Sequence, residues 1–237
     1  MLSSSTSFEG LLYWNFYKKD INCKRIILIK GLKFYIFNWF ILGICSAILL
    51  KIMRDIGADE SMFKPVLLNR YILSCHSNAH IVFLMILFVF PLVEELAFRL
   101  GLSFKKVHVM ISLPVFQLYL FMIFFQYSGT SVAALKYSCI VVCAASIVLL
   151  KFVPQFSFNL LKAKGGGFII CVVTFFFGFI HLSNYLIINI NFLPVYLFLC
   201  LPQLVMGMTA VYFRLNLGFF YSWIFHVLVN LIAIVLY

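Results

Sequence analysis

The sequence contains few charged residues and very few acidic ones. Only 11% of its 237 residues are charged, whereas soluble domains carry roughly 25%. Hydrophobic residues make up 65% of the chain, and the mean hydropathy is +1.10. A chain of this composition could not cover its surface with polar groups, which excludes an ordinary soluble domain. Its natural solvent is lipid.

The sequence also lacks the strict polar and apolar alternation of a membrane β-barrel. Its apolar runs have about the 20 residues that a helix needs to cross a bilayer, and unpaired backbone groups are costly in lipid. We therefore predict an all-α fold, a polytopic transmembrane helix bundle with seven spans, or eight if one is partial. The predicted spans are Phe34–Met53, Ala79–Phe98, Val107–Gln126, Val132–Lys151, Gly167–Leu186, Ile190–Tyr212 and Leu217–Tyr237.

No internal repeat or second domain is visible in the sequence. Residues 1–33 are predicted to form an interfacial segment, because Phe8–Lys33 mixes six Lys and Arg residues with aromatic ones, as segments lying along lipid headgroups do. Residues 34–237 form the predicted transmembrane domain. Within it, the run Gly165-Gly166-Gly167 follows two lysines and predicts a flexible loop before a helix.

The formal net charge of +11 raises the question of nucleic acid. In a membrane protein, cytoplasmic loops and anionic lipid headgroups account for it better. Placing the N-terminus in the cytoplasm puts most of the 18 Lys and Arg residues on the inner side. We therefore predict a multi-pass integral membrane protein of the bacterial cytoplasmic membrane with its N-terminus inside. Its expected partners include the lipid bilayer and exclude nucleic acid.

Acidic residues are absent after position 95, although more than half of the chain follows. The only acids inside a predicted span are Glu94 and Glu95, and ionisable groups at membrane depth usually mark function. Glu95 and Arg99 lie four positions apart on one helix face, which predicts an ion pair. Glu94 points about 100° away and is predicted to be free to act as a base. The alternative places both glutamates in a structural clamp with Arg99.

Two histidines lie within apolar predicted helices. Phe177 precedes His181 by one turn and can pack beside its ring, while Asn230 follows His226 by one turn on the same face. A lone membrane histidine is often only hydrogen-bonded to a neighbouring helix. Two histidines with a free glutamate and an asparagine favour chemistry instead. The remaining histidines are expected to be interfacial: His76, His80 and His108.

Missing residues exclude several intramembrane proteases. An aspartyl protease needs two buried aspartates, and no aspartate follows position 59. The His-Glu-x-x-His motif of metalloproteases and the Gly-x-Ser-x-Gly motif of serine hydrolases are both absent. What remains is attack by water that a carboxylate and imidazoles assist, with Asn and His donating hydrogen bonds to a developing oxyanion.

Three ordered motifs carry a family resemblance: Glu94-Glu95-Leu-Ala-Phe-Arg99, Phe177-x-x-x-His181 and His226-x-x-x-Asn230. Together they resemble the CPBP family, the CAAX-protease and bacteriocin-processing membrane proteins, also called the Abi family. The resemblance covers residues 79–237, and the stretch Leu201–Arg214 also resembles the family. The chain departs from many relatives in having two additional apolar segments between the first and second motifs, Val107–Gln126 and Val132–Lys151.

The resemblance implies an intramembrane endopeptidase, a hydrolase acting on a membrane-associated peptide or protein substrate. By position it implies that Glu94 and His181 activate water. It implies that His226 and Asn230 hold the oxyanion. The remaining residues of the implied site are Glu95, with the supporting residues Arg99 and Phe177.

Three alternatives stay open. The reaction is expected to need no cofactor, but zinc on Glu94, His181 and His226 would have the ligand types of a two-His-one-carboxylate site. The chain could instead be a non-catalytic membrane protein, with an immunity or partner-binding function. A transporter using Glu94 as a proton site is disfavoured, because repeat symmetry is absent.

The predicted spans place Glu94 toward the inner side of its helix and His181 toward the outer side of its own. A shared site therefore requires shifted span ends, or helices that are tilted or staggered.

Overall fold

The computed structural model describes residues 24–63, 79–128, 132–185 and 188–236, and all regular secondary structure in these ranges is helical. The predicted all-α fold is thereby confirmed for this part of the chain. The elements are α2 (Lys24–Asp55), η1 (Glu60–Phe63), α4 (Ala79–Leu84), η2 (Met85–Val89), α5 (Phe90–Phe98), η3 (Leu100–Ser103), α6 (Lys106–Ser128), α7 (Val132–Phe152), α8 (Gln155–Ile180), η4 (His181–Asn184), η5 (Ile190–Phe192), α9 (Leu193–Leu199), α10 (Leu201–Asn216) and α11 (Phe219–Leu236).

Helices or helical stretches long and apolar enough to cross a membrane number five in the described residues: Lys24–Asp55, His80–Phe98, Lys106–Ile123, Gln155–Asn184 and Ile190–Asn216. Two shorter apolar helices, Tyr137–Phe152 and Phe219–Val235, accompany them. Each of the seven predicted spans overlaps one of these stretches, of which five are long enough to cross a membrane. α2 begins at Lys24, so its helix starts inside the predicted interfacial segment.

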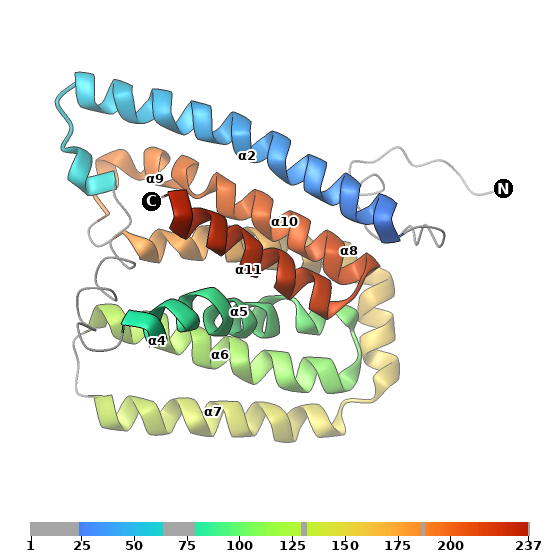
Figure 1. Cartoon of the computed structure of the whole chain (residues 1–237). Helices are drawn as coiled ribbons and strands as arrows, with labels where there is room; N and C mark the ends of the chain where they lie inside the picture. The colour runs from blue at the N-terminus through green and yellow to red at the C-terminus, as the bar shows by residue number, and fades with distance from the viewer. Residues whose placement is uncertain (1–23, 64–78, 129–131, 186–187, 237) are drawn as a thin grey trace.

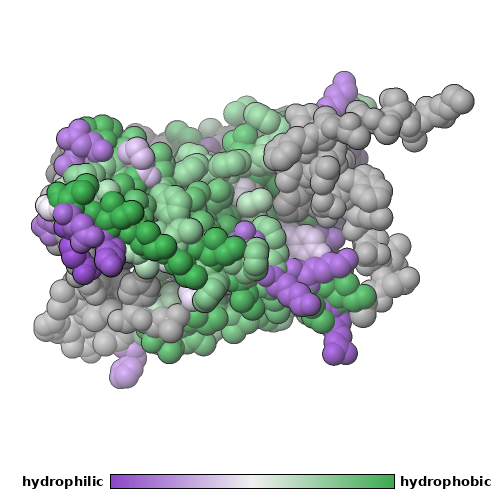
Figure 2. Space-filling view, turned by 90° about the horizontal axis from the view of Figure 1, so that it is seen from above, coloured by the Kyte–Doolittle hydropathy of each residue, from purple (hydrophilic) through white to green (hydrophobic). Residues whose placement is uncertain are grey.

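The surface is apolar along the middle of the helices. Many large apolar side chains there are exposed, among them Phe37, Val141 and Phe168. Figure 2 shows one face of the molecule, on which hydrophobic residues form a central band and hydrophilic residues gather toward the two ends. This distribution fits a bundle whose helix axes cross a lipid layer.

Helix α10 lies at the centre of the packing and contacts α2, α8 and α11. Figure 1 shows α2 along one side of the bundle and α7 along the opposite side, where α7 packs on α6. The buried residues of α10 include Met206, Ala210 and Phe213, which belong to the main hydrophobic core. The core therefore surrounds the segment that leads into the third motif.

Two glycines let α8 and α10 approach closely. A Cβ added at Gly178 would lie 3.0 Å from the Cα of Leu204, and one added at Gly207 would lie 2.8 Å from Cδ1 of Phe177. Small residues commonly allow such close packing between membrane helices. The contacts fix the register of the two helices, with Phe177 level with Gly207.

The prediction of a loop at Gly165-Gly166-Gly167 is wrong, because these residues lie inside α8. Three glycines cost a helix only about 1 kcal/mol each relative to alanine, whereas an unpaired backbone group in lipid costs several kcal/mol. The hydrogen-bonded helix therefore continues. Figure 1 shows that α8 bends, its first part crossing one end of the bundle and its second part running beside α10.

The Gly178→Ala substitution tests this close approach. Because its Cβ would meet backbone rather than a flexible side-chain end, we expect the substitution to lower the free energy of unfolding by about 1–3 kcal/mol. The matched control on the same helix is Gly165→Ala, whose Cβ would find only Leu161 Cδ1 at 3.9 Å. That variant should equal or slightly exceed the parent in stability. The measurement is thermal unfolding of both variants in the same detergent. Equal stability of Gly178→Ala and Gly165→Ala would contradict the proposed close approach.

Candidate active site

An ion pair between Glu95 and Arg99 occupies the end of α5, as the four-residue spacing predicts. Both side chains are buried, with exposed fractions of 0% and 1%. The Arg99 guanidinium carbon also lies 4.0 Å from the centre of the Phe177 ring, a distance at which a cation attracts an aromatic face. Arg99 is thus held between a carboxylate on its own helix turn and a ring from α8.

Glu95 has further hydrogen-bond partners on α11. The Ser222 hydroxyl lies 2.5 Å from Glu95 Oε2 and 2.9 Å from the carbonyl oxygen of Ala210. The Nδ1 atom of His226 lies 3.1 Å from Glu95 Oε1. With Arg99, these groups surround both carboxylate oxygens. Glu95 is therefore a structural junction between α5 and α11, and Ser222 extends the contact to α10.

Glu94 lies apart from Arg99, as predicted, and has other partners. The hydroxyl of Tyr119 donates to Glu94 Oε1 at 2.9 Å. Glu94 Oε2 lies 3.4 Å from Nε2 of His226, and its side chain is 14% exposed. Each oxygen thus has one close partner and keeps lone-pair capacity. Glu94 is the more accessible and less fully bonded acid of the pair.

His226 stands between the two glutamates, with Nδ1 toward Glu95 and Nε2 toward Glu94. One turn later, Nδ2 of Asn230 donates to the carbonyl oxygen of Ile86 at 3.3 Å. Ile86 belongs to η2, a π-helical turn, and such turns frequently occur at functional sites. His226 and Asn230 therefore share the face of α11 that meets the helix carrying the glutamates, as their spacing predicts.

His181 lies at the end of α8, with its Nδ1 atom 2.8 Å from the carbonyl oxygen of Phe177. The two rings are in edge contact at 5.0 Å between centroids, which confirms the predicted packing. A donor at Nδ1 leaves Nε2 as the acceptor of a neutral imidazole. Among the described residues, Nε2 of His181 has no hydrogen-bond partner and can act as that acceptor.

The helix stagger brings His181 toward Glu94. The rings of Phe177 and Phe98 meet at 5.3 Å, and Figure 1 shows α5 and α8 running in opposite directions. One turn forward from Phe177 is His181, and one turn back from Phe98 is Glu94, so both lie on the same level. Among the described residues no hydrogen bond joins them, but Phe177 contacts the rings of both His181 and His226. This register resolves the difference in depth that the predicted spans implied.

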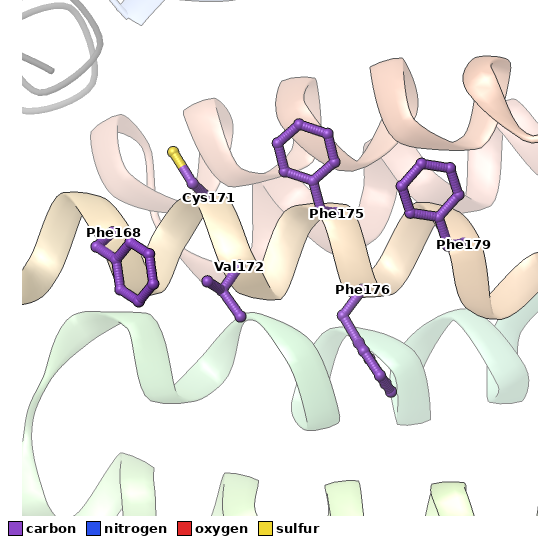
Figure 3. Close-up of a pocket in the computed structure, with 6 residues that line it drawn as sticks. All are labelled: Phe168, Cys171, Val172, Phe175, Phe176 and Phe179. Carbon is purple, nitrogen blue, oxygen red and sulfur yellow. The ribbon is translucent and has the colours of Figure 1, made fainter.

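The outer face of α8 is apolar. A groove of about 470 Å³ is lined there by Phe168, Cys171, Val172, Phe175, Phe176 and Phe179, and Figure 3 shows these side chains along the helix. The groove contains no acid, histidine or amide. Arg99, His181 and His226 lie instead around the Phe177 ring.

Sequence reasoning missed three residues of this cluster. Ser222 could have been identified from its spacing, because it lies one turn before His226 on the same helix face. Nothing in the sequence around Tyr119 points to the site, since this residue lies in α6, one of the two additional apolar segments. Arg214 donates from Nε to the carbonyl oxygen of Arg99 at 3.1 Å and from Nη2 to that of Leu100 at 3.2 Å. It thereby satisfies carbonyl groups at the end of α5.

The remaining histidines lie elsewhere where the structure describes them. His80 is exposed near the start of α4. The Nδ1 atom of His108 lies 2.6 Å from Ser103 Oγ. His76 lies outside the described residues.

The zinc alternative names Glu94, His181 and His226 as ligands. Within the described ranges, no group of three or more His, Cys, Asp or Glu side chains is arranged to hold a metal ion.

Comparisons of the chain with protein-family models, with curated proteins and with solved structures find no match. Assignment of a function therefore depends on the three motifs and on the arrangement of the side chains around Glu94.

Replacing Arg99 with Met tests the buried junction. The change leaves the Glu95 carboxylate without its cation, and we expect the free energy of unfolding to fall by about 3–5 kcal/mol. The control is Arg25→Met in α2, where the side chain is exposed and the expected change is within about 0.5 kcal/mol. Adding Glu95→Leu to Arg99→Met should restore part of the loss, because no unpaired charge remains. An Arg99→Met protein as stable as its parent would rule out this role.

Proposed function

We propose that this chain is an intramembrane endopeptidase of the CPBP type, which hydrolyses a peptide bond of a membrane-associated peptide or protein. The observation that carries the proposal is the position of Glu94. It is an accessible carboxylate inside an apolar bundle, 3.4 Å from His226 Nε2 and level with His181. A purely structural acid at this depth would be expected to have fully paired oxygens, as Glu95 does.

In the proposed reaction, a water molecule between Glu94 and His181 gives its proton to the Glu94 carboxylate while its oxygen attacks the peptide carbonyl carbon. Negative charge develops on the carbonyl oxygen. The second amide hydrogen of Asn230 donates a hydrogen bond to that oxygen, and so does Nε2 of His226 in the form that carries a hydrogen on both ring nitrogens. Glu94 then returns the proton to the leaving nitrogen, so the carboxylate is regenerated as the peptide bond breaks.

Several neighbouring residues would hold this arrangement without taking part in proton transfer. Tyr119 orients Glu94 through its hydroxyl. Glu95 orients His226 through Nδ1, and Arg99 keeps Glu95 in place. Phe177 contacts both histidine rings, with centroids 5.0 and 6.0 Å away.

The membrane arrangement that we propose has seven helices crossing the bacterial cytoplasmic membrane, with the N-terminus inside. Two observations support it: the two shorter apolar helices accompany the five longer stretches, and the basic residues concentrate on the sides that this topology puts in the cytoplasm.

A non-catalytic immunity or partner-binding protein is the second candidate. The hydrogen bond from Tyr119 and the nearby His226 give Glu94 partners of its own. On this alternative the whole cluster would be polar packing between helices.

The Glu94→Gln substitution distinguishes the endopeptidase from the non-catalytic protein. The purified protein, in vesicles of phosphatidylethanolamine and phosphatidylglycerol, is incubated with a proteome-derived peptide library, and new termini are identified by mass spectrometry. We expect cleavage by the parent and a loss of about 10²–10⁴-fold in the variant, the usual contribution of a general base. Tyr119 can still donate to the amide oxygen, so the fold should persist.

The matched control is Asp55→Asn at the exposed end of α2, which should cleave at the parental rate. A folded Glu94→Gln protein with parental activity would show that Glu94 is not the base. A parent that releases no new termini would favour the non-catalytic candidate.

Metal analysis tests the zinc alternative. We expect less than about 0.1 zinc ion per chain in purified protein, because the proposed carboxylate base activates water without a metal. Activity should persist after chelation. Stoichiometric zinc that is lost in a His181→Ala variant would overturn the metal-free mechanism.

A further inference from the structure

We propose that Gln203, in the first turn of α10, positions the substrate by accepting a hydrogen bond from a backbone N–H of the bound peptide. This inference rests on the proposed endopeptidase function. It adds a recognition element to the catalytic groups, on a helix that none of the three motifs includes.

The first observation is an unused acceptor. The Oε1 atom of Gln203 is buried and has no hydrogen-bond partner among the described residues. Buried side-chain oxygens are nearly always bonded in folded proteins, so each exception calls for an explanation. A ligand that binds at this place would supply the missing donor.

The second observation is the place of Gln203 in the helix register. Phe177 of α8 packs against Gly207 of α10, and Gly178 packs against Leu204. The two helices run in opposite directions (Figure 1). One turn before Gly207 is Gln203, and one turn after Phe177 is His181. Gln203 therefore lies across from His181, on the α10 side of the candidate site.

The other two buried atoms without partners in the described ranges do not offer an alternative. Ser46 Oγ belongs to α2, on the side of the bundle away from the glutamates. Arg99 Nη2 is a donor, and its guanidinium lies over the Phe177 ring. Gln203 is the one of the three that combines an acceptor with a position beside His181.

The chemistry of the acceptor indicates its partner. An oxyanion needs donors, which His226 and Asn230 supply, so a neutral carbonyl oxygen cannot help there. A peptide that enters an apolar site loses the water bound to its backbone N–H groups, so these groups need hydrogen-bond acceptors from the protein. The unpaired Gln203 oxygen, on the turn across from His181, would meet that need. Because the bond forms on binding and persists through the reaction, it should affect KM rather than kcat.

The test compares Gln203→Leu with the parent, in vesicles and with the library peptide that the parent cleaves fastest. We expect KM to rise about tenfold, equivalent to about 1.4 kcal/mol, while kcat stays within about twofold. The melting temperature should stay equal or rise, since an unsatisfied buried oxygen is removed. The matched control is Gln117→Leu, because Gln117 bonds Ser146 between α6 and α7; its KM should stay parental.

A second readout locates the bond on the substrate. Copies of the same peptide are methylated at one backbone nitrogen at a time. At one position, methylation should raise KM about tenfold for the parent but have no further effect in Gln203→Leu. A solely structural role for Gln203 would not produce this position-specific loss.

The outcomes separate this inference from the function on which it rests. If the parent releases no new termini, the proposed function fails and the role of Gln203 fails with it. If the parent cleaves and Glu94→Gln does not, but Gln203→Leu keeps the parental KM, only the Gln203 inference is overturned. A lower melting temperature with unchanged sensitivity to methylation would also overturn it.

Discussion

The carboxylate of Glu95 is the interaction on which the arrangement of the site depends. A buried charge in a lipid-embedded bundle must be paired and hydrogen-bonded. Glu95 meets this requirement with Arg99 from its own helix and with Ser222 and His226 from α11. Ser222 also reaches the Ala210 carbonyl of α10. One carboxylate thereby fixes three helices, and the ring of His226 is oriented as part of the same network.

The division between the two adjacent glutamates follows from this junction. Consecutive residues on a helix point about 100° apart, so the helix that directs Glu95 into the junction directs Glu94 elsewhere. Phe177 strengthens the division, because its ring lies against the Arg99 guanidinium on one side and contacts His181 and His226 at its edges. The positive charge of Arg99 is thus committed to Glu95. In the part of the chain that the structure describes, Glu94 meets Tyr119 and His226 and stays partly accessible.

The sequence was sufficient for features governed by spacing along one helix. The Glu95–Arg99 pair, the packing of Phe177 on His181 and the shared face of His226 and Asn230 each span one turn, and helix geometry alone predicts such contacts. Features that depend on packing between helices could not be predicted. Tyr119 reaches Glu94 from α6 across 25 positions, and nothing in its local sequence marks it. The glycines of α8 were misjudged because local propensity favours a loop, whereas the lipid environment favours an unbroken helix.

The resting contacts of His226 and Asn230 place a condition on the proposed reaction. Asn230 already donates one amide hydrogen to Ile86, so only its second hydrogen is available for an oxyanion. His226 Nε2 lies 3.4 Å from a Glu94 oxygen and would have to carry a hydrogen and turn it toward the substrate oxygen. Glu94 would then lose one of its two partners at the moment when it accepts a proton from water. On this scheme, substrate binding itself frees the base, and the π-helical turn beneath Asn230 supplies the carbonyl group that keeps the amide aligned until then.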